Sequence, residues 1–320
     1  MVLAVMAADN SPQPRPGLVS RPATLNGTAM PELPEVETVR RGLQPVLEGH
    51  RITRVQTRRG NLRIPFPDGF GQRLTGRRVA RLARRAKYLL AELDSGETLV
   101  IHLGMSGRMT VYKGGKILAL DGLEGESVAA EQGHGPHDHV ILETDAPARI
   151  VYTDHRRFGL MTLLETASMG GDKLFKGLGP EPLDKAFTPV VLGAALDGKK
   201  TSIKAALLDQ RVVAGIGNIY ACEALWRAGI SPKRQASTIP GERAKKLVPA
   251  IKKVLEDAIA AGGSTLRDYA KADGSLGYFQ HHFRVYDREG EPCPKKGCSG
   301  TIRRIVQTGR STFYCPKCQS

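Results

Sequence analysis

The sequence predicts a multidomain α+β protein, and three observations in its 320 residues lead to that prediction. Residues 51–164 mostly form short runs of alternating apolar and polar side chains separated by Gly, Asp and Ser, which indicates strands. From about residue 180 the apolar residues recur at helical spacing. Four of the five cysteines follow residue 292. We therefore expect a β domain, a helical domain and a small cysteine-rich module, in that order.

The chain begins with two segments of different character. Residues 1–29 combine a short apolar patch, with no positive charge before it, and a polar, proline-rich stretch, which fits neither a secretory signal nor a transit peptide. We interpret them as a disordered leader or as untranslated upstream sequence. A helix is expected next, because Pro34 suits a first helical turn, apolar residues recur at helical spacing as far as Leu47, and Gly49 ends the run.

The remaining elements follow from the periodicity. Strands of an antiparallel sandwich or barrel are expected at residues 78–83, 87–93, 98–103, 139–143 and 149–153. A surface loop is expected at 113–137 and a glycine-rich connector at 165–179. Helices are expected at residues 187–196, 201–208, 219–228 and 241–261, followed by a polar loop at 262–277.

The charge balance points to the class of partner. Lys and Arg number 47 against 32 Asp and Glu, which gives a net charge of +15 and a sequence pI near 9.8. Such a balance predicts a polyanionic partner, and no stretch approaches the roughly 20 apolar residues of a membrane span. Nucleic acid is therefore favoured over a membrane.

The cysteines form the most specific motif. Cys293 and Cys298 are separated by four residues, Cys315 and Cys318 by two, and sixteen residues lie between the pairs. Four thiolates in two close pairs suit one tetrahedral zinc ion, which has a structural role because no coordination position stays open. Disulfides are the alternative, disfavoured without a convincing export signal. Cys222 is expected to be a small buried residue. The basic residues expected to bring this module to phosphates are Arg303, Arg304, Arg310 and Lys317.

Pro31 has two interpretations that its spacing alone does not separate. If the chain starts at Met30 and that methionine is removed, Pro31 carries a secondary amine with a pKa of roughly 8. Such an amine can attack a sugar carbon and form an iminium, as a catalytic lysine does. Inside a longer chain the same nitrogen is an unreactive amide, and the segment is an ordinary proline-capped helix.

Two further motifs also have a structural and a functional interpretation. Gly215 and Gly217 permit a tight turn before Asn218, which is placed to cap the helix at 219–228. Helix-start amides and an asparagine amide can grip a phosphate, and the alternative is a packing corner between two helices. Arg84 and Arg85, at a strand start, are expected to form a solvated edge.

Met105 and Phe158 are candidate wedges. Met105 lies in a turn between glycines, and Phe158 follows two arginines. Taken singly, each would more often be a core residue. Together they suit a protein that extrudes one nucleotide from a duplex and fills the gap with apolar side chains.

Together these motifs resemble the formamidopyrimidine-DNA glycosylases, repair enzymes for oxidised purines, from Pro31 to the C-terminus. Residues 31–37 (PELPEVE) resemble the family's N-terminal signature, residues 213–221 its helix–two-turn–helix element, and the cysteine module its zinc finger. The four-residue first knuckle departs from the commoner two-residue spacing. The resemblance implies a bifunctional glycosylase and abasic-site lyase that excises 8-oxoguanine and formamidopyrimidines through a proline Schiff base and cleaves the strand by β,δ-elimination.

The resemblance also implies roles for individual residues. Pro31 would attack the sugar C1′, and Glu32 would donate a proton. Lys87 would take part in proton transfer, and Arg310 is expected mainly to stabilise phosphate charge, because arginine rarely titrates. The residues implied to contact DNA are His102, Met105, His137, Arg156, Phe158, Lys199 and Asn218, with Met105, Arg156 and Phe158 filling the gap and Arg156 facing the orphaned base. His155 stands where relatives often have proline.

The predicted organisation is a leader (1–29), an N-terminal catalytic domain of one helix plus an antiparallel β-sandwich (31–165), a linker (166–179), a helix–two-turn–helix domain (180–277) and a zinc finger (283–320). The expected partner is double-stranded DNA containing an oxidised purine, bound by a monomer in the cytoplasm and associated with the nucleoid. Two alternatives remain: an endonuclease VIII-like enzyme for oxidised pyrimidines, and a non-catalytic DNA-binding protein if Pro31 is not terminal. The PELPEVE start and the three wedge residues favour the purine enzyme.

Overall fold

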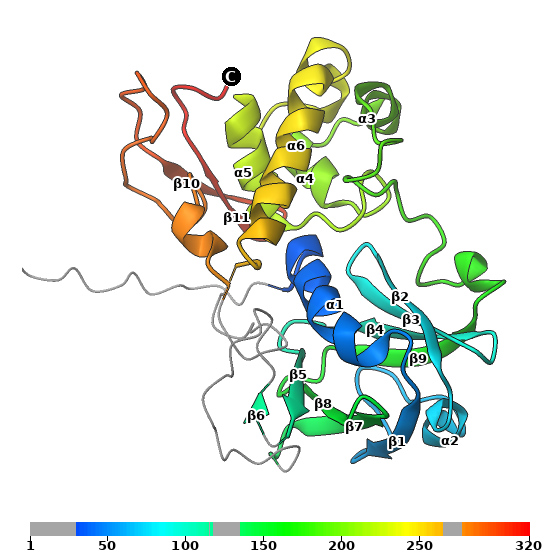
Figure 1. The fold of residues 1–320 in the computed structure, drawn as a ribbon. Helices are drawn as coiled ribbons and strands as arrows, with labels where there is room; N and C mark the ends of the chain where they lie inside the picture. The colour runs from blue at the N-terminus through cyan, green and yellow to red at the C-terminus, as the bar shows by residue number, and fades with distance from the viewer. Residues whose placement is uncertain (1–29, 115, 118–134, 265–276) are drawn as a thin grey trace, which may run out of the picture.

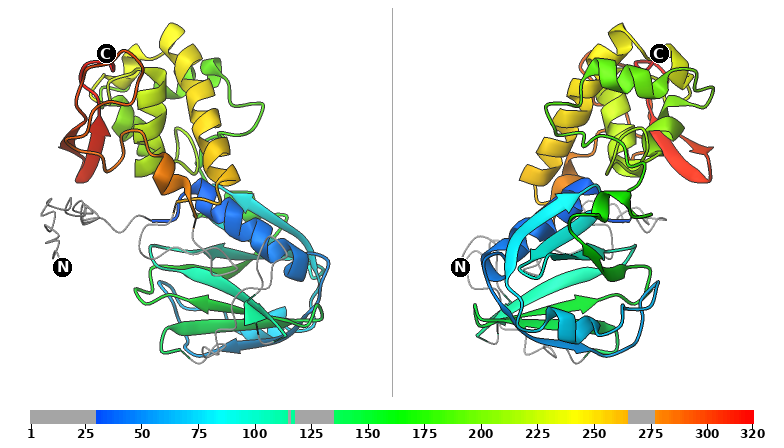
Figure 2. Two further views of the ribbon diagram at one scale, coloured as in Figure 1. Left: turned by 60° about the vertical axis from the view of Figure 1, so that its left-hand side comes forward. Right: turned by 90° about the vertical axis from the view of Figure 1, so that its right-hand side faces the viewer.

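The computed structural model describes residues 30–114, 116–117, 135–264 and 277–320, and these form a β lobe and a helical lobe (Figure 1). The leader at 1–29 and most of the loops expected at 113–137 and 262–277 lie outside the described residues. Helix α1 (Leu33–Leu47) lies at the junction of the two lobes (Figure 2). A site at the start of α1 can therefore include residues from both lobes.

Helix α1 confirms the predicted pattern. Its apolar stripe is at most 1% exposed, and Gly49 follows its end with a φ of +79°. Because each such side chain contributes about 1.5–3 kcal/mol when fully buried, the stripe anchors α1 to the sandwich core. The buried stripe consists of Val36, Val39, Leu43 and Leu47.

The β lobe is a sandwich of two antiparallel sheets, not a barrel. One sheet has the order β1-β7-β8-β5-β6 and the other β2-β3-β4-β9. The five predicted strands correspond to β2, β3, β4, β7 and β8. The strand bounds are β1 (Ile52–Thr57), β2 (Val79–Arg85), β3 (Tyr88–Leu93), β4 (Glu97–His102), β5 (Arg108–Lys113), β6 (Lys116–Ile117), β7 (Asp138–Thr144), β8 (Ala148–Thr153) and β9 (Leu160–Glu165), with a short helix α2 (Phe70–Leu74).

The connector after β9 belongs to the β lobe. It contains a 3-10 turn, η1 (Met169–Gly171), and Phe175, which is only 8% exposed and packs with Leu90 and Val100. Strands β3 and β4 are therefore covered on both faces, which explains their nearly continuous apolar sequence.

The helical lobe contains the four predicted helices: α3 (Pro189–Leu196), α4 (Ile203–Leu208), α5 (Asn218–Ala228) and α6 (Glu242–Ala260). The Thr188 and Ser202 side chains accept N-terminal amides of α3 and α4, which fixes where those helices begin. Helix α6 turns its predicted apolar face into the core and packs on α5. Within the described residues, no helix combines the length and apolar character needed to cross a membrane.

The C-terminal module is the hairpin of β10 (Arg303–Gln307) and β11 (Arg310–Tyr314), which packs on α5 (Figure 1). Two further 3-10 turns, η2 (Ala236–Thr238) and η3 (Phe279–His282), belong to this half. Cys222 is 1% exposed among the apolar residues of this module, and burial raises its pKa to about 11. It is a buried thiol, as predicted.

Candidate active site and nucleic-acid interface

The start of α1 is pressed against the turn between α4 and α5. A Cβ on Gly215, whose φ is +82°, would lie 2.7 Å from the Leu33 side chain, and one on Gly217 would lie 2.3 Å from Cδ of Glu32. The Leu33 amide donates to the Gly215 carbonyl at 3.0 Å. The two glycines therefore do more than form a tight turn: they let Glu32 approach the first amides of α5.

Glu32 is a buried carboxyl group at a helix start. It is 3% exposed and accepts hydrogen bonds from the amides of Gly217 at 2.6 Å and Ile219 at 3.0 Å. Burial raises its pKa to about 7, while the charge of Lys87 opposes that rise. A carboxyl group with this pKa is partly protonated at neutral pH and can donate a proton. Pro31 is buried directly beside it in the chain.

The prediction that Asn218 caps α5 is wrong. The helix begins at Asn218 itself, and the Glu32 carboxylate accepts the amides of the flanking residues Gly217 and Ile219. Those amides are therefore not available to grip a phosphate. The Asn218 Nδ2 atom instead donates to the Ser311 carbonyl of β11 at 2.9 Å, since a carboxylate accepts helix-start amides better than a neutral amide does.

Glu35 fixes the backbone of Glu32 by accepting a hydrogen bond from its amide. Its carboxylate accepts from the Glu32 amide at 2.9 Å, the Tyr220 hydroxyl at 2.5 Å, and the amide and hydroxyl of Ser264 at 2.8 and 2.9 Å. It is 2% exposed, and burial raises its pKa. These bonds join α1 to α5 and to the segment after α6, so Glu32 is fixed from both lobes.

Lys87 and Arg310 approach the same site from other elements. Burial lowers the pKa of Lys87, the negative charge of Glu32 counteracts this, and the positive charge of Arg310 adds to it. The β2–β3 turn, the start of α1 and the β10–β11 hairpin therefore bring Lys87, Glu32 and Arg310 within electrostatic reach of one another. We call Pro31, Glu32, Lys87 and Arg310 the amine site.

Lys204 is a charged neighbour that the sequence did not reveal. It is 0% exposed on α4, its Nζ lies 3.5 Å from the Ser311 carbonyl, and burial lowers its pKa. Its charge also interacts with Glu32 and Arg310. A lysine inside the apolar run IKAALL has no sequence signal that separates it from a solvent-facing one.

Arg84 and Arg85 are not the solvated edge that the sequence predicted. The Arg84 side chain is 10% exposed and pairs with Glu181 at 2.7 Å and Glu37 at 3.3 Å. Arg85 pairs with Glu181 at 2.8 Å. Their partners lie in α1 and beyond the connector, so local sequence could not indicate that these charges are neutralised inside the protein.

The three candidate wedge residues lie on two segments that contact each other. Met105 is half-buried in a turn, and Phe158 is 43% exposed with the Arg156 guanidinium 4.8 Å from its ring centre. A Cβ on Gly104 would lie 2.4 Å from the Phe158 backbone, so the Met105 turn contacts the Phe158 loop directly. We call the segments holding Met105, Arg156 and Phe158 the wedge loop.

Asp154 supports the wedge loop and was missed by sequence reasoning. It is 0% exposed, and its carboxylate accepts from the Ser106 hydroxyl, the Tyr152 hydroxyl at 3.0 Å, and the amides of Arg157 at 3.1 Å and Gly159 at 2.9 Å. One carboxylate thus fixes both segments of the loop. Its partners become visible only in the fold.

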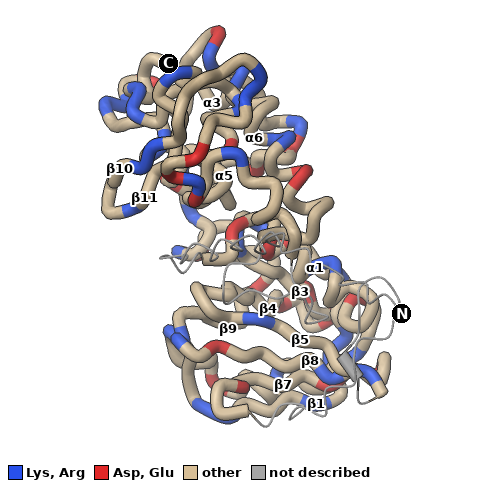
Figure 3. Tube along the Cα trace, turned by 90° about the vertical axis from the view of Figure 1, so that its left-hand side faces the viewer, with Lys and Arg blue, Asp and Glu red and all other residues tan. Residues whose placement is uncertain are grey.

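Of the other predicted DNA contacts, His102 and His137 lie next to the wedge loop, whereas Lys199 lies in the helical lobe. His102 Nδ1 accepts the Gly104 amide at 3.0 Å, and burial lowers the pKa of His102 to about 4, so its ring is neutral with hydrogen on Nε2. His137 is exposed, with its ring 6.2 Å from that of His155 beside the wedge loop. Lys199 follows α3. Its positive charge adds to the lowering of the Asp209 pKa, which is due mainly to the hydrogen bond from Arg211. Lys and Arg lie along both lobes and the β10–β11 hairpin (Figure 3).

The four clustered cysteines fit one zinc ion. Their Sγ atoms lie within 4.8 Å of one another, and two pairs, Cys293 with Cys318 and Cys298 with Cys315, are 3.7 Å apart. A tetrahedral zinc ion with Zn–S bonds of about 2.3 Å places sulfurs roughly 3.8 Å apart, whereas a disulfide needs about 2.05 Å. The thiols are free of disulfides, and the module can bind one structural zinc ion.

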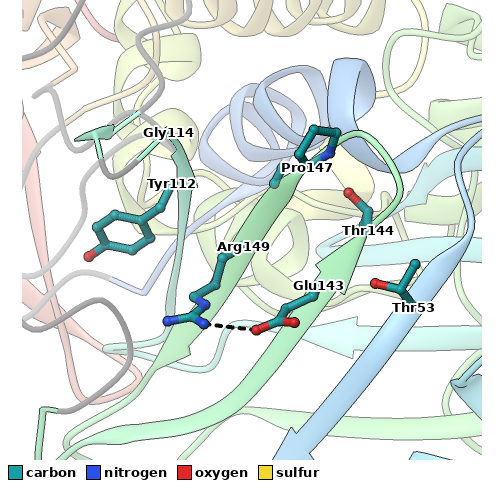
Figure 4. Close-up of a pocket in the computed structure, with 8 residues that line it drawn as sticks. Thr53, Tyr112, Gly114, Glu143, Thr144, Pro147 and Arg149 are labelled. Atoms are coloured by element: carbon teal, nitrogen blue, oxygen red, sulfur yellow. Dashed lines mark hydrogen bonds and ion pairs between the residues drawn. The ribbon is translucent and has the colours of Figure 1, made fainter.

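A hollow of about 290 Å³ lies elsewhere, on the β1-β7-β8-β5-β6 sheet (Figure 4). Its lining includes Tyr112, Thr144 and an ion pair between Arg149 and Glu143 at 2.9 Å. The hollow shares no lining residue with the amine site or the wedge loop, and the charges of its ion pair offset one another. It is therefore separate from both of these sites.

Known protein families match successive parts of the chain. Residues 30–161 match the formamidopyrimidine-DNA glycosylase N-terminal domain, residues 178–270 the formamidopyrimidine-DNA glycosylase H2TH domain, and residues 290–320 the zinc finger found in FPG and IleRS. The chain belongs to the formamidopyrimidine-DNA glycosylase family. The predicted family and fold class are confirmed. Members are DNA glycosylases of base excision repair with abasic-site lyase activity, and the chain is an enzyme of this kind.

Individual relatives agree with this membership. The formamidopyrimidine-DNA glycosylase of Ruegeria sp. (strain TM1040) is 57% identical over 290 residues, covering 91% of this chain and 100% of the relative. The crystal structure of MutM (FPG) from Thermus thermophilus is similar, with a TM-score of 0.75, 38% identity, and 90% and 98% of the two chains covered. A Lactococcus lactis Fpg structure in complex with DNA containing an abasic site gives 0.77 and 32%, with 90% and 99% covered.

Proposed function

We propose that this protein excises oxidised purines, 8-oxoguanine and formamidopyrimidines, from double-stranded DNA through an N-terminal amine on Pro31. The observation that carries the proposal is the convergence of residues from three elements at one site, where Pro31 and Glu32 are buried, Lys87 is half-buried and Arg310 is exposed. A nucleophile, a proton donor and two cations beside it form the set that sugar–base cleavage requires.

The chemistry begins at the sugar. The lone pair of the Pro31 nitrogen forms a bond to C1′, and the bond between C1′ and the base breaks. Glu32, whose pKa is about 7, supplies the proton that opens the sugar ring or neutralises the departing base. The Pro31 nitrogen then loses its proton, and the bond between C1′ and O4′ breaks as O4′ takes up a proton. The product is an open-chain iminium that joins C1′ to Pro31.

Strand cleavage follows from the acidity of that iminium. Loss of the neighbouring sugar protons lets the 3′ and then the 5′ phosphate leave, which breaks the strand on both sides. Lys87, with its lowered pKa, is a suitable proton carrier, and Arg310 stabilises phosphate charge. Zinc supplies no step; bound by Cys293, Cys298, Cys315 and Cys318, it would hold the hairpin that carries Arg310.

The wedge loop makes the lesion accessible. Extrusion of a nucleotide costs a few kcal/mol, which Met105 and Phe158 would partly offset by filling the gap while Arg156 faces the orphaned base. A neutral His102 can donate its Nε2–H to a phosphate without carrying a charge. The remaining proposed DNA contacts are His137, Lys199 and Asn218.

A start at Met30 is part of the proposal. The N-terminal family model begins at residue 30, and 91% of this chain accounts for the full length of the Ruegeria relative. Removal of Met30 would then free the Pro31 nitrogen. We further propose that the enzyme acts as a monomer associated with the nucleoid in the cytoplasm.

Borohydride trapping tests the nucleophile. A chain that starts at Met30 and the full chain are each incubated with a duplex carrying 8-oxoguanine opposite cytosine, and mass spectrometry identifies the terminal residue of each. We expect a covalent adduct only when Pro31 is terminal. A verified Pro31 terminus that binds the duplex but gives neither adduct nor cleavage would overturn the proposal in favour of a non-catalytic DNA-binding protein. Preference for a duplex carrying an oxidised pyrimidine would instead support the endonuclease VIII-like alternative.

A further inference from the structure

Glu181 lies beyond the connector, yet its carboxylate binds the turn that delivers Lys87 to the amine site. Its Oε1 atom accepts the Ala86 amide at 2.6 Å and the Arg85 guanidinium at 2.8 Å. Its Oε2 atom accepts the Arg84 guanidinium at 2.7 Å. One carboxylate thus binds each of the three residues that precede Lys87.

The turn needs an external partner because its backbone is strained. Arg85 pairs with Tyr88 across β2 and β3, so Ala86 and Lys87 form a two-residue hairpin loop. Ala86 has a φ of +53°, a conformation that glycine adopts readily and alanine does not. A strained residue persists when its surroundings determine its conformation, and the 2.6 Å bond from its amide to Glu181 provides that constraint.

The same charge cluster ties the turn to α1, the helix that follows Pro31. Arg84 donates to the Ala86 carbonyl at 2.9 Å and to Glu37 of α1 at 3.3 Å. Arg85 also donates to the Gly179 carbonyl at 2.5 Å, at the end of the connector. The Lys87 turn, α1 and the connector are therefore held by one network of charged hydrogen bonds centred on Glu181.

We propose that Glu181 is a positioning residue for Lys87: it holds the strained Ala86 conformation that aims the lysine at Glu32 and the sugar. This inference rests on the proposed role of Lys87 in proton transfer. Loss of Glu181 lets the turn relax and moves the Lys87 ammonium. The chemical steps then slow, while DNA affinity, which depends on other surfaces, stays unchanged.

The test compares four variants of the chain that starts at Met30: Glu181→Gln, Ala86→Gly, the two combined, and Glu143→Gln. Glu143 is the matched control, because its carboxylate also pairs with an arginine at 2.9 Å but lines the hollow away from the amine site. The readouts are the single-turnover rate of strand cleavage on abasic-site DNA, the affinity for an uncleavable abasic analogue, and the melting temperature.

We expect Glu181→Gln to slow cleavage by about 10- to 100-fold, since a displacement of about 1 Å can cost that much, with affinity within about twofold of the parent chain. Adding Ala86→Gly should restore part of the rate, because glycine reaches the required φ without help. A fold that is merely weakened would not be rescued by an additional glycine. Glu143→Gln should cleave at the parental rate.

Three results would overturn the inference: an unchanged rate in Glu181→Gln, a rate loss matched by an equal loss of affinity, or no recovery on adding Ala86→Gly. Lys87→Met separates this inference from the function on which it rests. If Lys87→Met leaves cleavage unchanged, the proposed role of Lys87 itself fails. If Lys87→Met slows cleavage and Glu181→Gln does not, only the positioning role of Glu181 fails.

Discussion

The amine site and the wedge loop differ in which kind of side chain is buried and which is exposed. The amine site buries a carboxyl group: Glu32 is 3% exposed, and burial shifts the pKa values of both Glu32 and Lys87 toward their neutral forms. The wedge loop exposes apolar surface instead, with Phe158 43% exposed beside the Arg156 guanidinium. The first region should therefore respond to pH and charge, and the second to side-chain size.

Both regions nevertheless depend on a buried carboxylate that touches no proposed reacting atom. Asp154 binds four donors beneath the wedge loop, and among the described residues Glu35 binds four donors around the start of α1. In each case the carboxylate joins segments that are far apart in the chain. The two regions thus differ in their functional side chains, which are buried and ionisable in one and exposed and apolar in the other. In both regions a buried carboxylate holds the backbone that carries these side chains.

The largest effect should come from removing the buried acid. Glu32→Gln should lower the single-turnover rate of base release by about 10²- to 10⁴-fold, the usual contribution of general acid catalysis. The surface variant Glu242→Gln is the control, because Glu242 pairs with Lys245 at the start of α6 and its pKa is lowered rather than raised. A rate loss below about threefold in Glu32→Gln would contradict the assignment of Glu32 as proton donor.

In the parent enzyme, the rate of base release should depend on pH through the titration of Glu32. Glu32 donates only when protonated, so the rate should fall as pH rises through about 7, the raised pKa of Glu32. The Pro31 amine attacks only when unprotonated, so the rate should also fall as pH drops below roughly 8. Base release should therefore be fastest between these values. A single-turnover rate that keeps rising up to about pH 9 would exclude Glu32 as the donor.

A smaller effect is expected in the wedge loop. Phe158→Ala should slow base release on a fully paired duplex by about 10- to 100-fold. Extrusion of a nucleotide costs a few kcal/mol, and the variant lacks the ring that offsets part of this cost. The loss should shrink when the lesion lies opposite a one-nucleotide gap, where no partner base has to be displaced. Val190→Ala, which truncates a 79% exposed side chain on α3, should leave both rates unchanged. Equal losses on the two substrates would show that Phe158 does not act as a wedge.

Sequence reasoning succeeded where a signal is local or has fixed spacing. The apolar stripe of α1, the alternating strands and the paired cysteines each depend on neighbours within a few residues or on one ligand geometry. It failed where a side chain finds its partner across the fold. Asn218 was expected to cap its own helix but bonds to a carbonyl 93 residues away, and Glu32, 187 residues from Ile219, took its place.

The supporting residues were missed for the same reason. Glu35 is joined to Ser264 across 229 residues, and Asp154 to Ser106 across 48. Arg84 looked like a solvated charge because its partner Glu181 lies 97 residues further along the chain. The sequence around a single acidic residue does not show whether its carboxylate is buried and hydrogen-bonded or exposed to solvent. The reactive groups could be proposed from motifs, whereas the groups that position them could not.

The smallest effect should come from Lys199, which belongs to neither region. It is half-buried after α3, and a phosphate contact there would add affinity without aiming any reacting atom. Each neutralised phosphate contributes about 0.9 to the slope of log affinity against log salt concentration. For about four neutralised phosphates the slope is roughly −3.6, and Lys199→Ala should flatten it to about −2.7. The cleavage rate at saturating DNA should stay unchanged. Lys253→Ala, which removes a surface lysine paired with Asp257, is the control. An unchanged slope in Lys199→Ala would place the DNA backbone away from α3 and confine the electrostatic contacts to the amine site, the wedge loop and the zinc hairpin.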